Sequence, residues 1–204
     1  MINVKKSIQI LLLSLIVGGC SLQTTVPASS KYMLNVEIEN SSVSASNFNE
    51  KVIRVGQVES SPILNTRSIY YRVDGGRSYS YTKARWMEDV PKQLTNLLML
   101  SVTKTNIFKD VIPFRSLAKN DLILESSLYT FTQTIHEDGT STLKLAVKIR
   151  LVEQYSRKII ASKLFEYQQD DVSGDAEGAT TGYSVLTTKL LHDVNQWLSS
   201  SCQQ

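Results

Sequence analysis

The sequence predicts a single α/β domain of the α+β kind, in which two amphipathic helices pack on one mixed, antiparallel-rich central sheet. Three observations predict it. Side chains suited to a buried stripe recur every three or four positions within 90–102 and again within 176–197, the period of a helix with one buried face. Several other runs alternate apolar and polar residues, which is typical of half-buried strands. Glycine-containing turns join some neighbouring runs, as in antiparallel hairpins.

The N-terminus has the pattern of an export signal that ends at a lipidated cysteine. A pair of lysines precedes an apolar run over 8–17, which is too short to cross a bilayer as a permanent helix. The Val-Gly-Gly-Cys sequence at 17–20 fits a bacterial lipobox. We therefore expect residues 1–19 to be removed as a signal peptide and a diacylglycerol to be attached to the thiol of Cys20. Ser21, where an aspartate would signal retention, favours an outer-membrane lipoprotein that faces the periplasm.

The predicted mature chain is close to electrically neutral. The full sequence has 22 basic and 19 acidic residues, and loss of the signal removes only Lys5 and Lys6, which leaves 20 basic residues against 19 acidic. Near-neutral charge without a basic cluster argues against nucleic acid as a partner. Once Cys20 is acylated, Cys202 is the remaining cysteine, so no internal disulfide is possible and we expect an exposed thiol.

A lipidated tether at 20–32 is expected to lead into one domain at 33–204. The tether is small, polar and contains proline, a composition that suits a link between lipid and domain. Alternation over 34–39 predicts a half-buried strand at the start of the domain. The run at 52–58 predicts a second strand, in which Gly56 is a candidate bulge.

Residues 69–81 predict a β-hairpin. Alternating runs at 69–73 and 77–81 flank Asp-Gly-Gly at 74–76. The glycines accept the positive φ that such turns need, so this is a strong hairpin signal.

The first helix is predicted to begin near Asp89. That residue suits the N-cap or an early acidic position, where its charge faces the positive end of the helix dipole. Pro91 suits the first turn, because a residue there has no intrahelical N–H bond to lose. The stripe predicted to face the sheet consists of Val90, Leu94, Leu97, Leu98, Ser101 and Val102.

The second half of the chain is predicted to add further strands. A short strand at 108–112 ends at Pro113. The next strand, at 121–135, shifts its alternation near residues 126–127, which indicates a bulge. A turn at 136–139 leads to a clean alternation at 143–151, and a last strand follows at 159–167.

The chain is predicted to close with a long helix. An acidic loop at 170–177 leads into it, where negative charge favours the helix dipole. Gly178 and Gly182 each cost roughly 1 kcal/mol relative to alanine in a helix interior. The predicted core stripe is nevertheless regular, and consists of Ala176, Ala179, Tyr183, Leu186, Leu190, Val194 and Trp197.

The hairpin and the start of the first helix resemble a known family. Tyr71-Arg72 on the first strand, a tyrosine-rich return strand that includes Tyr81, and then Trp86 with Pro91 five residues later are similar to the bacterial ABC-type transport auxiliary lipoproteins. The Pqi-type lipoproteins of MCE lipid-transport systems belong to this family. Where the family often has Leu-Asp-Arg before the first hairpin strand, this chain has Leu-Asn-Thr-Arg at 64–67, so a role tied to that aspartate does not carry over.

The resemblance implies a fold, a role and partners. The family fold is a mixed α/β domain around one central sheet, in which Tyr81, Trp86 and Pro91 would be structural. The implied role is that of an accessory subunit in lipid transport or membrane integrity. Its partners would be an MCE-domain protein or other components of an ABC transporter, together with the membrane through the lipid anchor. Self-association into a homo-oligomer around the partner would fit the same role.

The sequence shows no catalytic or metal-binding pattern. His136 and His192 have no companions at a ligand or triad spacing, so solvated histidines are the simpler interpretation. Asp121 and Glu125 could pair on one strand, although solvent-facing side chains are expected there. The Asp-Gly-Gly turn lacks the lysine and serine of a phosphate-binding loop, so this chain is not the ATPase of a transporter. We expect no enzyme activity, no metal, and no cofactor beyond the covalent lipid on Cys20.

The tyrosines of the hairpin allow two interpretations. They could form a partner-binding surface, for which the candidate residues are Tyr70, Arg72, Arg77 and Tyr79. They could equally pack the sheet against a helix, as cross-strand aromatic pairs do. Two rival functions also stay open: binding of a small amphiphile in a groove between sheet and helices, and a structural role in the envelope without any ligand.

Overall fold

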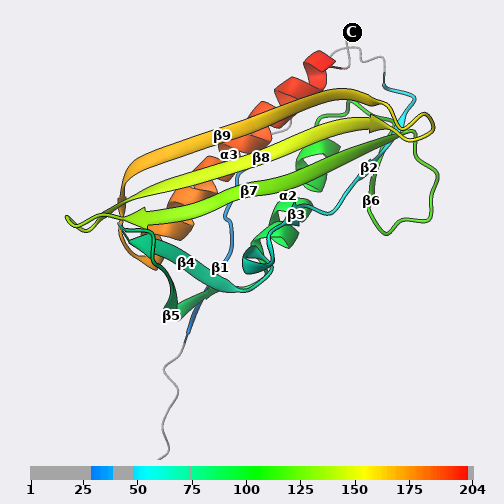
Figure 1. Cartoon of the computed structure of the whole chain (residues 1–204). Coiled ribbons are helices and arrows are strands. Elements are labelled where there is room, and N and C mark those ends of the chain that lie inside the picture. The colour runs from blue at the N-terminus through cyan, green and yellow to red at the C-terminus, as the bar shows by residue number, and fades with distance from the viewer. Residues whose placement is uncertain (1–28, 39–47, 74, 202–204) are drawn as a thin grey trace, which may run out of the picture.

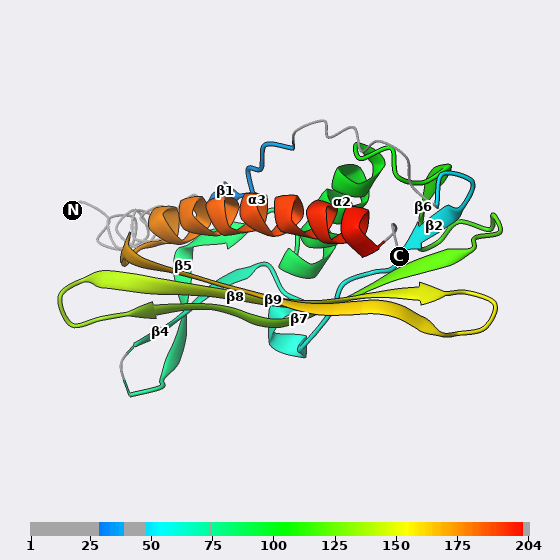
Figure 2. The same ribbon diagram turned by 90° about the horizontal axis from the view of Figure 1, so that it is seen from above.

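The computed structural model describes residues 29–38, 48–73 and 75–201. Within these residues, nine strands form one mixed sheet. The two α-helices of the described chain lie together on one side of that sheet, as Figure 2 shows. The predicted fold class is therefore confirmed.

The elements follow one another from a short N-terminal strand to a long C-terminal helix (Figure 1). In chain order they are β1 (Ser30–Tyr32), β2 (Val52–Val55), β3 (Glu59–Ser60), the 3₁₀ turn η1 (Pro62–Leu64), β4 (Ser68–Val73), β5 (Ser78–Trp86), α2 (Val90–Thr103), β6 (Asp110–Pro113), β7 (Leu122–Ile135), β8 (Thr140–Glu153), β9 (Ile159–Ser173) and α3 (Ala176–Ser201).

Strand β7 is the centre of the sheet. Along one side it pairs antiparallel with β8 over nearly its whole length, and β8 pairs antiparallel with β9. Along its other side it pairs in parallel with β2, β3 and β4. Strand β6 extends the sheet beyond β2, while β5 and then β1 extend it beyond β4. The long antiparallel ladders thus form a platform, and the β4–β5 hairpin lies at one end of it (Figure 1).

Helix α2 begins as the sequence predicts. The Asp89 carboxylate accepts a hydrogen bond from the Lys92 N–H at 3.0 Å, and Pro91 lies in the first turn. The predicted stripe faces the core: Leu97 is half-buried, and the other five members are buried. The N-terminal signals therefore fix the start of this helix, and its stripe of apolar residues fixes which side faces the core.

Helix α3 lies along β9 and contacts β8. Its predicted stripe is buried or half-buried throughout. A Cβ on Gly182 would lie 2.3 Å from Cδ1 of Leu143, and a Cβ on Gly178 would lie 2.4 Å from the backbone oxygen of Ser173. These two glycines therefore permit a close approach of the helix to the sheet, which offsets their cost in helix propensity.

The strand predicted over 34–39 is wrong for the part that the structure describes. The Leu34 N–H donates to Oε1 of Gln93 at 2.8 Å, and the Asn35 N–H donates to Oγ of Ser184 at 3.0 Å. Side chains of α2 and α3 thus take the place of a neighbouring strand, although buried and exposed residues do alternate. The paired strand is β1, at the end of the segment expected to be tether; it lies parallel to β5.

Other strand boundaries differ from the prediction by a few residues. Strand β2 ends at Val55, and the following Gly56 donates its N–H to the Leu124 oxygen at 2.9 Å. The register shift in β7 falls between Leu128 and Thr130, slightly later than predicted. Strand β9 continues to Ser173, because β8 is long enough to pair with it there, so the first half of the predicted acidic loop is strand.

Several predictions lie outside the described residues. These are the signal peptide at 1–19, the lipidated Cys20, most of the tether, Asp74 of the hairpin turn, and Cys202. Among the described residues, no helix combines the length and the hydropathy needed to cross a membrane.

Candidate functional site

The hairpin formed by β4 and β5 has two different faces. The ladder pairs Tyr71 with Tyr79. Because successive strand residues point to opposite faces, the side chains sort into two sets. One face holds Tyr71, Tyr79 and Tyr81, and the other holds Tyr70, Arg72, Ser78 and Ser80. Of the four residues predicted as one partner interface, Tyr79 therefore lies on one surface and Tyr70 and Arg72 lie on the other, while Arg77 precedes β5 next to the turn.

The first face is an aromatic cluster. The ring centroid of Tyr71 lies 5.7 Å from that of Tyr79 and 4.6 Å from that of Tyr81. Exposure increases toward the turn, since Tyr81 and Tyr71 are half-buried and Tyr79 is 42% exposed. Both interpretations of the tyrosines thus have a place in this cluster: Tyr81 packs, and Tyr79 is available to a partner.

Tyr81 is fixed to the body of the domain by its hydroxyl. The hydroxyl donates to Oε1 of Gln133 at 2.9 Å and lies 3.3 Å from the Gly174 oxygen. Burial raises the pKa of the Tyr81 hydroxyl far above its ordinary value, and the nearby Asp175 and Tyr71 act in the same direction. The hydroxyl therefore stays protonated and remains a donor.

Gln133 is the centre of a buried polar network. Its side chain is completely buried, and its Nε2 lies 3.0 Å from Oγ of Ser141 and 3.3 Å from the backbone oxygens of Ser173 and Asp175. The network joins the hairpin to β7, β8, the end of β9 and the start of α3. It ties β5 of the hairpin to the centre of the sheet.

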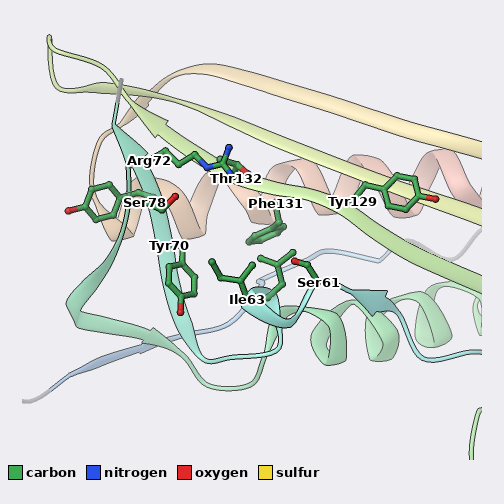
Figure 3. A pocket seen from close by; sticks show the side chains of 10 residues that line it. Ser61, Ile63, Tyr70, Arg72, Ser78, Tyr129, Phe131 and Thr132 are labelled. Atoms are coloured by element: carbon green, nitrogen blue, oxygen red, sulfur yellow. The ribbon is translucent and has the colours of Figure 1, made fainter. Parts of the chain in front are cut away.

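The second face borders a small cavity of about 110 Å³ between η1, β4 and β7. Figure 3 shows Tyr70 beside Ile63, with Arg72 farther along the same strand and Tyr129 coming from β7. Ile63 is 50% exposed and Tyr129 is 60% exposed, so this cavity has large apolar side chains open to solvent at its edge. The cavity is well below the roughly 300–1,000 Å³ of ordinary ligand pockets.

Both arginines of the hairpin are available for contact. Neither the Arg72 nor the Arg77 side chain has a hydrogen-bond or ion-pair partner among the described residues, and both residues are exposed. The turn between them needs its glycines, because Gly75 and Gly76 have φ of 92° and 84°. The turn is thus flanked by two arginine side chains that have no partner among the residues that the structure describes.

The other two family-motif residues are structural parts of the core. Trp86 is 1% exposed and meets Phe131 edge to face at 6.1 Å between centroids. Phe131 in turn stacks on Tyr183 of α3 at 3.7 Å. This column of rings connects β5, β7 and the last helix, while the buried Pro91 starts α2.

A second cavity, of about 770 Å³, lies beside the segment that joins β2 to β3. Its lining is largely polar and charged, and includes Glu59, Asp89, Glu125 and Arg150. Charged groups keep strong hydration, so this lining does not suit an acyl chain. In the described part of the chain, neither cavity is an apolar groove between sheet and helices.

The histidines and acids that could serve in catalysis or metal binding do not form a common site. His136 lies 3.0 Å from Oγ1 of Thr142, and His192 lies 2.9 Å from Nε2 of Gln196. Asp121 accepts the Val52 N–H at 2.8 Å and does not pair with Glu125. Among the described residues, no group of three or more His, Cys, Asp or Glu is placed to hold a metal ion.

Sequence reasoning missed three residues at this site: Gln133, Ile63 and Tyr129. The sequence did carry a signal for Gln133. The residues that share its side of the predicted strand point into the core, and a buried amide needs hydrogen-bond partners. Ile63 and Tyr129 gave no signal, since their place beside Tyr70 depends on long-range pairing of β4 with β7.

Comparison with known proteins agrees with the fold. Residues 32–195 match the family model described as ABC-type transport auxiliary lipoprotein component. Protein XCC0632 from Xanthomonas campestris is similar at a TM-score of 0.75 and 15% identity, over 86% of this chain and 98% of that one. A hypothetical protein, CT253, from Chlamydia trachomatis has a TM-score of 0.51 and 7% identity, over 76% of this chain and 99% of that one. A search of curated proteins finds no significant match.

Proposed function

Because the chain belongs to the family of ABC-type transport auxiliary lipoprotein components, we propose that it acts by docking, as a lipid-anchored and non-enzymatic subunit, onto another periplasmic component of its transporter. The family description supplies the transport role and the class of partner. The resemblance to Pqi-type lipoproteins adds that the partner carries an MCE domain and that the cargo is lipid.

The β4–β5 hairpin is the proposed docking surface. The single observation that carries this is that the hairpin exposes Arg72, Arg77 and Tyr79, and that the side chains of the two arginines have no hydrogen-bond or ion-pair partner among the described residues. Arginine and tyrosine are enriched at interface hot spots, where both lose water on binding. The network around Gln133 keeps the hairpin in one orientation, so little ordering entropy is lost on docking.

Photocrosslinking in cells tests the surface and the partner together. A crosslinking amino acid at Tyr79 reports on the aromatic face, and one at Tyr70 or Ser80 reports on the other face. Lys148 on β8 serves as the comparison site, because it lies in the long-strand platform away from the hairpin. We expect adducts to one periplasmic transporter component from one hairpin face and none from Lys148. Adducts from Lys148 alone would move the interface to the platform.

The anchor is part of the same proposal. Replacing the thiol in Cys20→Ala removes the atom that would carry the diacylglycerol. Two or more acyl chains hold a protein stably on a membrane, at about 0.8 kcal/mol per buried CH₂, whereas one chain holds it only marginally. We expect no incorporation of labelled palmitate into Cys20→Ala and recovery of the wild type with the outer-membrane fraction. Labelling of the variant would exclude Cys20 as the acylated residue.

The rival function, direct binding of an amphiphile, has less support. The cavity beside the hairpin is small, and the larger one is charged. Native mass spectrometry of the purified chain carrying Cys20→Ala separates the two functions. Bound lipid at a fixed stoichiometry, together with an absence of crosslinks from the hairpin, would favour amphiphile binding over docking.

A further inference from the structure

The end of the molecule away from the hairpin turn carries an unusual pair of loops. They are the β6–β7 loop, residues 114–121, and the β8–β9 turn, residues 154–158. Both lie at the same end of the long strands in Figures 1 and 2. They are joined by a backbone hydrogen bond from the Gln154 N–H to the Asp121 oxygen at 2.8 Å. We call these two loops the basic tip.

The basic tip exposes large apolar side chains. Leu117 is 102% exposed and Tyr155 is 98% exposed, so neither contacts the body of the domain. Phe114 is 36% exposed, and Ile159, directly after the turn, is 53% exposed. Burial of such side chains is a main source of folding free energy, yet here the fold leaves them in water.

Arg54 holds the backbone of the β6–β7 loop in place and so keeps the loop exposed. Its guanidinium donates to the backbone oxygens of Phe114, Ser116 and Ala118, at 3.1, 2.7 and 2.9 Å. It also donates to the side-chain oxygen of Asn120 at 2.9 Å. The loop is wrapped around one charged group, which fixes its backbone and holds Leu117 outward. An arginine that satisfies three carbonyls gives the loop the order that a small core would otherwise provide.

Positive charge surrounds these apolar side chains. The two loops contain four basic residues against one acid, Asp121, whose carboxylate accepts the Val52 N–H at 2.8 Å. The basic residues are Arg115, Lys119, Arg157 and Lys158. Glu153, just before the turn, accepts a hydrogen bond from the Ser156 hydroxyl. The guanidinium of Arg115 lies 5.1 Å from the Phe114 ring, so cation and aromatic are presented together.

We propose that the basic tip binds the surface of a membrane rich in anionic lipids, with Leu117 and Tyr155 inserted among the head groups and the basic residues paired with lipid phosphates. Membrane interfaces favour this combination of side chains, because apolar groups enter the acyl boundary while Lys and Arg stay at the head groups. The side chains protrude singly from convex loops rather than lining a groove, which suits a fluid lipid surface better than a shaped protein partner.

The tip is separate from the proposed docking hairpin and from β1, the described strand that follows the expected tether. In both views β1, which follows the tether, lies toward the other end of the molecule from these loops. Anchor and tip would then hold the domain at two separated points and fix its orientation on a membrane. The tip proposal does not depend on the hairpin, so each can fail alone.

Cosedimentation with vesicles tests the proposal on the expected mature chain, residues 20–204, carrying Cys20→Ala, so that neither the apolar run of the signal nor an attached lipid binds the vesicles. Vesicles of phosphatidylcholine are compared with vesicles that contain equal amounts of phosphatidylcholine and phosphatidylglycerol. We expect binding to the anionic vesicles that weakens with added salt, because a screened charge attracts less. Leu117→Ser or Tyr155→Ser should each lower the partition coefficient about tenfold. Arg115→Gln and Lys119→Gln should each lower it about fivefold.

Matched controls come from α3. Val185 is 55% exposed and Lys189 is exposed, so Val185→Ser and Lys189→Gln change the same kinds of group away from the tip and should leave binding unchanged. Equal losses in tip and control variants, or no binding to anionic vesicles, overturn the proposal. If a crosslinker at position 117 captures a protein in cells while vesicles are not bound, the tip is a protein contact and the lipid proposal is wrong.

Discussion

Replacement of Gln133 by leucine tests whether the buried network fixes the hairpin. Gln133→Leu keeps a similar volume and removes every polar atom at the centre of the network. The amide has two N–H donors for its three neighbouring acceptors, so at most two donated bonds and the one accepted from Tyr81 are lost.

The expected loss in the free energy of unfolding depends on which hydrogen bonds the partners of Gln133 retain in the variant. Tyr81 retains the Gly174 oxygen at 3.3 Å, the Ser173 oxygen retains the Ser141 hydroxyl at 3.2 Å, and the Asp175 oxygen retains the Ala179 N–H at 3.0 Å. No partner is orphaned, so each lost bond costs its net value of about 1 kcal/mol rather than a full desolvation penalty. Three bonds, less a small gain from burying leucine, predict a loss of about 2 kcal/mol in the free energy of unfolding.

Urea unfolding followed by circular dichroism measures this loss, and a double-mutant cycle with Tyr81→Phe assigns it. Tyr81→Phe alone should cost about 1 kcal/mol, and the two changes together should cost about 1 kcal/mol less than their sum. Thr134→Val, a half-buried neighbour on the same strand, should stay within about 0.5 kcal/mol of the wild type. If Gln133→Leu unfolds at the wild-type midpoint, or if the two changes add fully, the network does not hold the hairpin.

Three further predictions concern α3. Gly178→Ala should destabilise the protein by about 1–3 kcal/mol despite its better helix propensity, because the new Cβ meets the Ser173 backbone; a rise in melting temperature would contradict this. Leu190→Ala should cost about 2–5 kcal/mol, since Leu190 is completely buried, whereas Val185→Ala on the exposed side should cost less than about 0.5 kcal/mol in the same thermal scan. Asp175 accepts bonds from the Gly178 N–H and the Ser173 hydroxyl, which lower its pKa below 3.8. A lowered folded-state pKa stabilises the fold above the unfolded pKa and loses that effect as pH falls through the folded value. Asp175→Ala should therefore cost about 1 kcal/mol at neutral pH and progressively less below pH 3.8, as measured by urea unfolding across that range.

The hairpin and the start of α2 could be predicted because their signals are local. Two glycines with positive φ, alternation on either side, and Asp89 with Pro91 all act within a few residues of the structure they specify. The stripe of α3 was equally plain, since its period continues over many turns. Even there, the reason for Gly178 and Gly182 came only with the fold, because the atoms that exclude a Cβ belong to β8 and β9.

The segment at 33–38 shows why other elements could not be predicted. Alternation of buried and exposed residues is the same for a strand and for an extended chain that lies on helices. What decides between them is the bonding partner of each N–H group, and here those partners are 59 and 149 residues away in sequence. The arrangement of the candidate site could not be predicted for a similar reason. Sequence placed Tyr70, Arg72 and Tyr79 in one hairpin, but their division between two faces depends on the ladder register.

The parallel pairing of β1 with β5 has a mechanical consequence. On the proposal that Cys20 is lipidated, tension between membrane and domain enters the fold at Ser30. Pulling along β1 loads the pairs of Ser30–Tyr32 with Ala84, Arg85 and Trp86 in shear, so that they resist together instead of unzipping one by one. Behind them, the bonds from Leu34 to Gln93 and from Asn35 to Ser184 transmit the remaining force to both helices. The first point of attachment is thus the end of β5 that lies farthest along the strand from the hairpin turn, so the load enters the hairpin at its base and several residues away from the exposed Tyr79.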